Sequence, residues 1–484
     1  MEFVTKVVEC VNTFLWDYAL LILLLGAGII YSFSLKFIQI RKFGAGMKAL
    51  FGNFSLHGGK GENGLSSFQA LTTAIAAQVG TGNIAGAATA IASGGPGSIF
   101  WMWVSAFFGM ATIYAEAVMA QHTRKLENGH YVGGPVYYIK YVFKGRFGKF
   151  LAGFFSVAII LALGFMGNMV QSNSIGAAFN NAFHVPKLAV GICVAVIAGI
   201  IFIGGIKRIA SFTEKIVPLM ALLYIIGCLV ILVMHLPGVG TAFKDIFVGA
   251  FAPQAIAGGA LGVTVQKAMR FGVARGLFSN EAGMGSTPHA HATAEVKDPC
   301  DQGIIAMMGV FIDTFIILTL TALVILSTGV LGNGQTGSEL AQSAFNVGFG
   351  NFGNIFIALC MLFFAFTTIV GWYYFGEVNV RKWCNKSLCS DRCDLRNHRI
   401  YIESRSGMGY GRYVQWFNGA SKPDCTSWMS GDRSQIDEKE RKKQRKIMEY
   451  RQKQKNPLWV KKPKRIFLKL VKLYLIFIKQ WYNI

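Results

Sequence analysis

A glycine-containing interruption inside an apolar segment limits what this chain can fold into. Residues 65–91 form a long apolar stretch, and Gln-Val-Gly-Thr-Gly-Asn at 78–83 places two glycines and three polar side chains in its middle. Within hydrocarbon, each unpaired backbone N–H or C=O group costs several kcal/mol, so an unwound segment persists only where protein groups or a water-filled cavity supply partners. We therefore predict that this helix breaks at residues 78–83 and binds a ligand there.

The rest of the sequence is typical of a polytopic membrane protein. Of its 484 residues 53% are hydrophobic, and many apolar runs approach the length of about 20 residues that crosses a bilayer. We expect an all-α protein whose first apolar run, 14–38, stays as a membrane anchor, because no signal-peptide cleavage pattern follows it. The other predicted helices are 65–91, 97–121, 148–178, 187–206, 211–235, 246–270, 302–331 and 353–379.

Positive charge predicts how these helices are oriented. The formal net charge is +23, and basic residues gather in alternate loops, as the positive-inside bias of membrane proteins requires. We assign Lys207, Arg208 and Lys215 to an inner loop and the uncharged residues 236–240 to an outer loop. The chain has no recognisable nucleic-acid-binding module, so we expect a lipid bilayer and no nucleic acid as its partner.

This orientation gives two helix sets of opposite sense. Helix 65–91 runs outward and helix 246–270 runs inward, and each is interrupted by glycines, Gly258 and Gly259 in the second case. Opposed repeats with broken first helices are typical of secondary transporters that bind substrate at the bilayer midplane. The predicted organisation is a leading helix and connector at 1–64, a first five-helix repeat at 65–240, an incomplete second repeat at 241–380 and an aberrant basic tail at 381–484.

The broken segment offers two kinds of ligand group. The N–H groups at the start of one half-helix favour a carboxylate, and the carbonyls at the end of the other favour a cation. Close packing of small residues such as Gly82 and Gly86 is the alternative explanation, but it does not require the polar side chains of Gln78, Thr81 and Asn83. A dinucleotide site is excluded because no strand precedes the glycines.

Two adjacent hydroxyls, Thr367 and Thr368, interrupt the last apolar helix. Such hydroxyls often bond back to the carbonyl four residues earlier. Alternatively, they supply the neutral oxygens that a small hard cation prefers, together with carbonyls of Ala77 and Gly80. Trp372, one turn further, is either a wall of the ligand pocket or an ordinary core aromatic.

Several other polar residues are weaker candidates. Asn168, Gln171, Ser172 and Asn173 lie on the cavity side or at a helix end. Glu116 and Asp313 are lone acids within apolar helices, which makes them candidates for function; the alternative is that both lie near the cytoplasmic mouth. Residues 272–297 are too polar to span lipid and are predicted as short helices and turns, with Asn280 and Glu281 as a gate or helix cap. His289 and His291 diverge on a helix, so we expect no metal site there, and without a nucleophile–base arrangement we expect no enzyme and no cofactor.

Five motifs together resemble the alanine or glycine:cation symporters, also called sodium:alanine symporters. They are Ala-Gln-Val-Gly-Thr-Gly-Asn-Ile-Ala-Gly at 77–86 and the segments 94–109, 133–139, 272–286 and 371–377. The resemblance implies a LeuT-type fold of inverted five-helix repeats with an extra leading helix. It also implies sodium- or proton-driven uptake of alanine or glycine across a prokaryotic cell membrane.

The resemblance also implies roles for individual residues. Residues 78–83 correspond to the unwound first core helix, Thr367 and Thr368 to the sodium site, and Trp372 to the tryptophan beside the substrate. With the polar and glycine residues weighed above, the predicted substrate-binding set is Gln78, Gly80, Thr81, Gly82, Asn83, Gln171, Gly258, Gly259 and Trp372. The predicted sodium ligands come from Ala77, Gly80, Thr367 and Thr368.

The tail departs from the family pattern. The family continues with two further membrane helices after Gly376 and Glu377, whereas this sequence turns polar at Trp383, so the last two core helices are missing. We attribute the tail to a pair of compensating reading-frame errors between residues 381 and 440. Sodium–alanine symport is therefore the preferred function, with two alternatives: a proton-coupled amino-acid permease, and a degenerate sensor or scaffold that does not transport.

Overall fold

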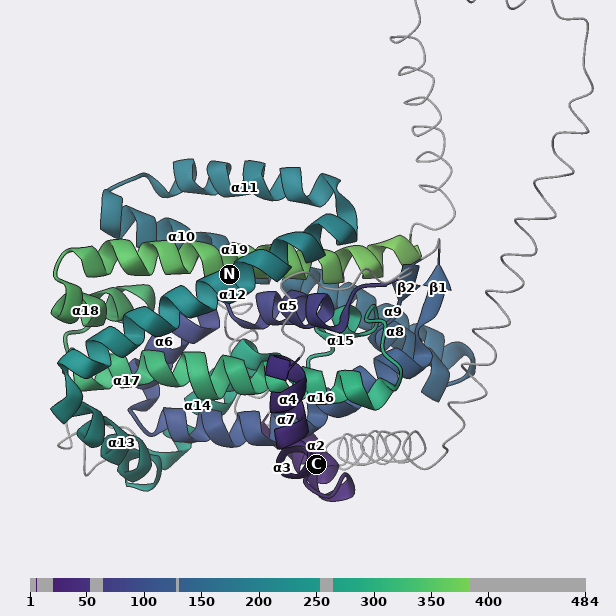
Figure 1. The fold of residues 1–484 in the computed structure, drawn as a ribbon, viewed down its shortest axis with the longest axis horizontal. Coiled ribbons are helices and arrows are strands. Elements are labelled where there is room, and N and C mark those ends of the chain that lie inside the picture. Colours follow the sequence, from purple (N-terminus) through teal and green to yellow (C-terminus); the bar gives the residue numbers. More distant parts are fainter. Residues whose placement is uncertain (1–5, 7–20, 53–63, 128–129, 253–263, 384–484) are drawn as a thin grey trace, which may run out of the picture. The chain divides into compact units, whose positions relative to one another are not determined.

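The structure is a computed structural model that describes Lys6 and residues 21–52, 64–127, 130–252 and 264–383. The described residues up to Asn379 belong to one compact unit, and they are mostly helical (Figure 1). Within this part of the chain, β1 (Lys125–Glu127) and β2 (His130–Val132) form an antiparallel hairpin. The predicted all-α class is therefore confirmed apart from that hairpin.

The first part of the chain contains the predicted interrupted helix. The helix α5 begins after a capping box in which Ser66 and Gln69 satisfy each other's backbone N–H groups. It ends at Gln78, and a π-helical turn, η3, follows from Gly82. The elements up to residue 142 are η2 (Leu21–Leu25), α2 (Gly26–Ser34), α3 (Ile38–Arg41), α4 (Phe43–Gly52), α5 (Ser67–Gln78), η3 (Gly82–Gly86), α6 (Ala87–Gly94), α7 (Ser98–Thr123) and α8 (Pro135–Val142).

The later helices include two long ones that contain π-helical segments, η4 and η6. Such segments often mark functional sites. The elements are α9 (Gly145–Ile159), η4 (Ile160–Gly167), α10 (Asn168–Phe183), α11 (Lys187–Ile203), α12 (Gly205–Met234), α13 (Leu236–Phe251), α14 (Val265–Asn280), α15 (Pro288–His291), α16 (Pro299–Val310), η6 (Phe311–Leu318), α17 (Thr319–Ser327), α18 (Gly337–Phe349) and α19 (Phe352–Trp383).

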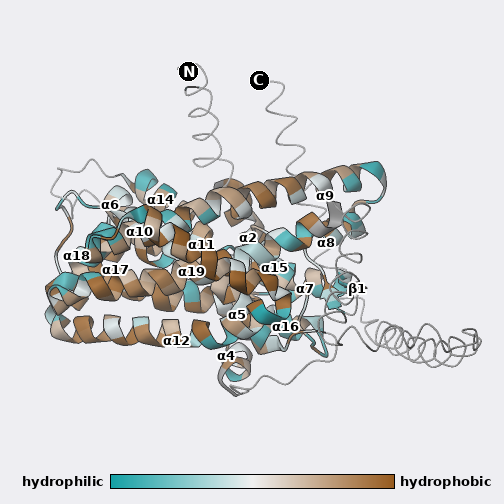
Figure 2. Cartoon of the chain, turned by 90° about the horizontal axis from the view of Figure 1, so that it is seen from above, coloured by the Kyte–Doolittle hydropathy of each residue, from teal (hydrophilic) through white to brown (hydrophobic). Residues whose placement is uncertain are grey.

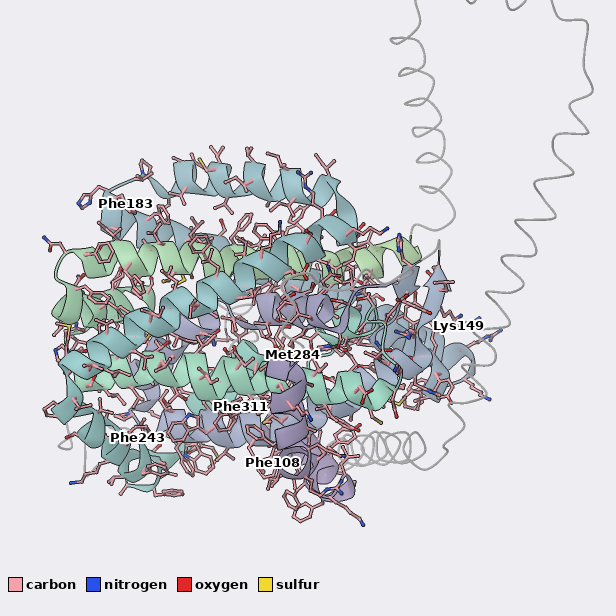
Figure 3. The ribbon with its side chains drawn as sticks, viewed as in Figure 1. Phe108, Lys149, Phe183, Phe243, Met284 and Phe311 are labelled. Atoms are coloured by element: carbon pink, nitrogen blue, oxygen red, sulfur yellow. The ribbon has the colours of Figure 1, made fainter. Side chains whose placement is uncertain are left out.

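Burial separates inner from outer helices. Within the described residues, five helices are long and apolar enough to span a membrane, namely Ser98–Thr123, Gly145–Phe183, Gly205–Met234, Pro299–Ser327 and Phe352–Val380. The first and the last two are mostly buried, whereas Gly145–Phe183 and Gly205–Met234 expose large apolar side chains. Figure 2 shows brown, hydrophobic residues along α9 and α12, and Figure 3 shows Phe183 and Phe243 at the outside of the helices. Lipid, not water, suits such surfaces.

Several sequence predictions need correction. Residues 236–240 are not a loop, because Pro237 occupies the first turn of α13, where its missing N–H costs no hydrogen bond. The basic residues Lys207, Arg208 and Lys215 lie in α12, since the turn at Gly205, with φ +64°, ends just before them. The helix predicted at 14–38 is interrupted after Ser34, where Lys36 and Phe37 have positive φ.

The predicted helix 246–270 is also divided differently. Its first part belongs to α13, which ends at Phe251, and its last part to α14, which begins at Val265 with the Thr264 side chain as cap. Because α14 continues to Asn280, the prediction of short helices and turns holds only after that residue. Gly258 and Gly259 lie outside the described residues, as does the tail beyond residue 383. The repeat relation and the domain boundaries stay predictions.

Candidate functional site

The break in α5 is the centre of the site. Val79 has extended φ and ψ, and its N–H still donates to Ile75 O at 2.7 Å. The next two N–H groups leave the helical pattern: Gly80 N–H donates to Asn83 Oδ1 at 3.0 Å, and Thr81 N–H donates to Gln171 Oε1 at 3.2 Å. All of these residues are buried, so side-chain oxygens replace the backbone acceptors that an intact helix would provide.

Two glycines of the break lie in close contact with neighbouring helices. A β-carbon at Gly80 would lie closer than 3.0 Å to Thr368 Oγ1, a separation that real contacts essentially never show. A β-carbon at Gly82 would lie 3.1 Å from Ser279 Oγ. The absence of both side chains lets α19 and α14 approach the unwound backbone directly.

The two predicted hydroxyls point in different directions. Thr368 Oγ1 lies 3.1 Å from Ala76 O and 3.0 Å from Phe364 O, so its one hydroxyl proton is shared between these carbonyls and the side chain joins α19 to the end of α5. Thr367 Oγ1 bonds back to Phe363 O and Phe364 O at 2.9 Å each and lies 3.5 Å from Met220 Sδ of α12. The structure therefore brings Thr368 and Gly80 together, and the carbonyl that Thr368 contacts is that of Ala76 rather than Ala77.

Trp372 lies one turn beyond Thr368 and is 2% exposed. Its ring occupies the space left by Gly167, where any β-carbon would overlap the indole, and meets Phe278 edge-on at 6.4 Å. Its Nε1–H donates to Glu281 Oε1 at 2.5 Å. The indole is thus held in one orientation by packing on one side and a carboxylate on the other.

Glu281 is the buried acceptor of this contact. It follows α14 with φ +55°, an uncommon conformation for a residue with a side chain, and Ser286 Oγ donates to its Oε2 at 2.5 Å. Burial raises the pKa of Glu281 to about 7, although the hydrogen bonds from Ser286 and Trp372 act in the opposite direction. Glu281 lies between α14 and α15, outside the candidate membrane spans, and connects Trp372 to that turn.

Gln78 and Asn280 connect α5 to α14. Gln78 Nε2 donates to Asn280 O at 2.8 Å, and Gln78 Oε1 is buried with no hydrogen-bond partner among the described residues. Asn280 Oδ1 in turn accepts from Ala282 N–H at 3.1 Å, which is an Asx turn at the end of α14, and its Nδ2 donates to Thr314 Oγ1 at 3.3 Å. The interpretation of Asn280 and Glu281 as a gate or helix cap stays a prediction.

Asp313 is fully buried beside the break and does not lie at a cytoplasmic mouth, the alternative that the sequence left open. Asn83 Nδ2 donates to Asp313 Oδ1 at 2.7 Å and to Asp313 O at 3.0 Å. The sequence marked Asp313 only as a lone acid in an apolar segment. Its link to Asn83 joins positions 230 residues apart and has no signal in a single sequence.

Other predicted residues lie elsewhere or play structural roles. Of the polar residues 168–173, which lie in the first turns of α10, Gln171 is buried and Asn173 is exposed. Glu116 accepts from Gly283 N–H at 3.2 Å. His289 and His291 bond separately, to Asn379 and to Gln302, and the described residues contain no group of three or more potential metal-binding side chains.

These features define a polytopic helical membrane protein with a buried, polar helix break. The chain belongs to the sodium:alanine symporter family, because the family's model matches residues 1–393. The resemblance inferred from the motifs is confirmed, and the chain is a membrane transport protein of the sodium–amino-acid symporter type.

Named relatives support the same assignment. An uncharacterized transporter of Haemophilus influenzae is 44% identical over 77% of this chain and 81% of its own length. The sodium/alanine symporter AgcS of Methanococcus maripaludis is 42% identical, over 78% of this chain and 83% of its own. The probable sodium/glutamine symporter GlnT of Bacillus subtilis is 40% identical, over 80% of this chain and 79% of its own length. The last two relatives are named for different substrates, alanine and glutamine, so the family match alone leaves the substrate of this chain open.

Proposed function

We propose that this chain takes up alanine or glycine together with sodium across a prokaryotic cell membrane, with both ligands at the break in α5. The observation that supports this most is that Gly80 and Thr81 direct their N–H groups to side chains instead of to the preceding helical turn. Side-chain acceptors can be exchanged for a ligand without unfolding a helix. The break therefore offers backbone donors that a substrate can use.

The substrate carboxylate would bind at Thr81. Its N–H group lies at the start of the segment η3–α6, where the helix dipole favours negative charge. Gln171 Oε1 now accepts from that N–H, so the amide oxygen marks the place of a carboxylate oxygen. The α-ammonium group would then face the carbonyls at the end of α5, where the dipole has the opposite sign.

Close packing around the break favours a small side chain. Gly80 lies against Thr368, Gly82 lies against Ser279, and the Trp372 ring fills the space beside Gly167. A pocket enclosed this tightly would admit alanine or glycine and reject larger amino acids by steric overlap. Gly258 and Gly259 remain part of the proposed substrate site as a prediction from the sequence.

Sodium would bind where α19 meets α5. Thr368 Oγ1 and the Ala76 carbonyl already lie 3.1 Å apart, and both are neutral oxygens of the kind that a hard cation prefers. Of the other predicted ligands, Gly80 adjoins this point, Ala77 packs against Gly371 of α19, and Thr367 would have to turn away from Met220. Sodium there would fix the break in the conformation that binds substrate, so each ligand would favour the other.

Uptake into proteoliposomes tests this function. With an inward sodium gradient, labelled alanine should accumulate above its external concentration, and replacing sodium by choline should abolish accumulation. An unchanged rate in choline, together with dependence on an imposed proton gradient, would identify a proton-coupled permease instead. Alanine binding by the purified chain without any accumulation would identify a sensor or scaffold.

A further inference from the structure

We infer that the connection between α8 and α9 binds the headgroup of an anionic phospholipid. We call this surface the basic elbow. Its residues, all exposed, are Lys140, Lys144, Arg146, Phe147, Lys149 and Phe150. None of them belongs to the candidate site at the helix break, so the inference does not depend on the proposed function.

The four cations of the basic elbow lack a counter-charge. Within the described part of the chain, none of them has an ion-pair partner. The sequence contains no Asp or Glu between Glu127 and Glu214, so neighbouring positions cannot supply one. Both of these acids have other partners, since Glu127 accepts from the Tyr137 hydroxyl at 3.0 Å and Glu214 from Gln69 Nε2 at 2.9 Å. Like charges gathered on one short segment attract an anion.

The backbone of the basic elbow places these cations at the start of a helix. α8 ends at Val142, and the next two residues are extended. Gly145 has φ +83°, and a β-carbon at Gly148 would overlap Phe143 O, so the chain turns tightly into α9. Lys144, the residue before α9, provides no side-chain cap. The uncapped N–H groups and the helix dipole there favour a phosphate group.

An apolar stripe continues from the basic elbow along α9, η4 and α10. Its members are 51–70% exposed and are Phe150, Phe154, Leu161, Phe165 and Met169. They extend over about 20 residues, or about 30 Å of helix, which matches the hydrocarbon core of a bilayer. Arg146 precedes Phe150 by four residues and therefore lies on the same face of α9. Figure 3 shows Lys149 and Phe183 at opposite ends of the molecule.

This position selects a lipid as the partner. Cations and aromatic rings directly outside a hydrocarbon-length stripe lie at the level of lipid headgroups. An anionic phospholipid supplies a phosphate for the cations and acyl chains for the stripe, and basic clusters at this level bind such headgroups. A zwitterionic lipid would add a positive group beside four others. By the positive-inside bias, the lipid belongs to the inner leaflet.

The cations have different roles in binding. The planar guanidinium group of Arg146 can donate to two phosphate oxygens at once, whereas Lys144 and Lys149 act as point charges. Replacing either lysine should therefore weaken binding mainly through charge, and added salt should weaken it as well. Replacing Arg146 by lysine should weaken binding although the charge stays.

Equilibrium binding of radiolabelled dioctanoylphosphatidylglycerol to the purified full-length chain in neutral detergent tests the inference. Each basic residue near an anionic lipid contributes a factor of about five in affinity. The double variant Lys144→Gln, Lys149→Gln should therefore raise the Kd about tenfold or more, and Arg146→Gln about fivefold. Dioctanoylphosphatidylcholine should bind the parent chain at least about tenfold more weakly.

The matched control is the double variant Lys207→Gln, Lys215→Gln. It also removes two exposed lysines, but from α12. Its Kd for the anionic lipid should stay within about twofold of the parent value. Equal losses in the two double variants would show that the net charge of the chain attracts the lipid, which would overturn the inference. Size-exclusion chromatography checks folding, and these exposed side chains leave the core intact.

A competition experiment distinguishes a lipid from a soluble anion. Glycerol phosphate, which has the phosphate without acyl chains, should not displace the labelled lipid at equal concentration. Displacement by glycerol phosphate, or equal affinity for both dioctanoyl lipids, would overturn the inference. Because no transport is measured, such a result would leave the proposed function unchanged, and a chain that fails to accumulate alanine can still bind this lipid.

Discussion

Replacing Gly80 with alanine should raise the sodium concentration needed for uptake, whereas the same change at Gly86 should not. The added β-carbon at Gly80 would lie closer than 3.0 Å to Thr368 Oγ1. That oxygen cannot turn away freely, because it is buried and bonded to both Ala76 O and Phe364 O. At Gly86, the last residue of η3, the nearest atom to an added β-carbon is Thr81 O at 3.8 Å, an ordinary contact.

The structure sets the size of the expected effect. Overpacking a closely packed site costs about 1–3 kcal/mol. Losing the hydrogen bond from Thr368 to Ala76 adds about 1 kcal/mol. Because 1.4 kcal/mol corresponds to a tenfold change in an equilibrium constant, the half-saturating sodium concentration should rise about tenfold or more if the displaced hydroxyl is a sodium ligand.

Initial rates of labelled-alanine uptake against external sodium measure this effect, and size-exclusion chromatography with thermal unfolding checks that each variant folds. The double variant Gly80→Ala, Thr368→Ala removes the overlapping oxygen. It should regain thermal stability without regaining sodium affinity, which separates a packing defect from the loss of a ligand. Equal half-saturating sodium concentrations for Gly80→Ala and Gly86→Ala would refute this account of the break.

Four further predictions can be tested separately. Trp372→Phe leaves Glu281 Oε1 buried without its donor and should lower the free energy of unfolding by about 1–3 kcal/mol. Trp103→Phe, which removes only a hydrogen bond to the Thr319 hydroxyl, should lower it by less, as measured by thermal unfolding. Equal losses in the two variants would contradict the importance of the contact between Trp372 and Glu281. Gln171→Glu places a carboxylate at Thr81 N–H, where it should compete with the substrate carboxylate and raise the KM for alanine about tenfold. Asn173→Asp makes the same charge change on an exposed side chain and should leave this KM unchanged. At pH values between the ordinary pKa of glutamate and about 7, Glu281 holds a proton in the folded chain that it has released in the unfolded chain. The free energy of unfolding should therefore fall as the pH rises through this range, by up to about 3 kcal/mol. Thermal unfolding should show that fall in the parent chain and in the exposed control Glu339→Gln but not in Glu281→Gln. Finally, resequencing the gene should reveal two compensating single-base insertions or deletions between codons 381 and 440, and an unaltered reading frame would exclude this origin of the tail.

Local pattern predicted the position of the break and the main membrane helices. The two glycines and three polar residues at 78–83 interrupt an apolar stretch, and the helix is interrupted there. The predicted helix 97–121 is close to α7, Ser98–Thr123. In both cases the information lies within one segment, in hydrophobic length and in residues that cannot continue a helix.

Other features depend on contacts between distant segments, which local pattern does not contain. The prediction of paired sodium ligands treated Thr367 and Thr368 alike, yet one faces α12 and the other faces α5. Neighbouring helix positions differ by about 100° in direction, so only the packing of α19 decides which hydroxyl meets the break. Likewise, residues 236–240 have the composition of a loop, but Pro237 suits the first turn of a helix equally well.

The break is held by three different neighbours, and this bears on how ions and substrate could be coupled. Thr368 of α19 meets Ala76, Gln171 of α10 meets Thr81, and Asp313 of η6 meets Asn83. A ligand at any one contact therefore restricts the same short backbone segment. Under the proposed function, sodium must then raise the affinity for alanine by the same factor by which alanine raises the affinity for sodium, because the total free energy of binding both ligands is the same for either order of binding. A factor of one, with neither ligand changing the equilibrium affinity for the other, would mean that the two ligands do not share one ordered state of the break.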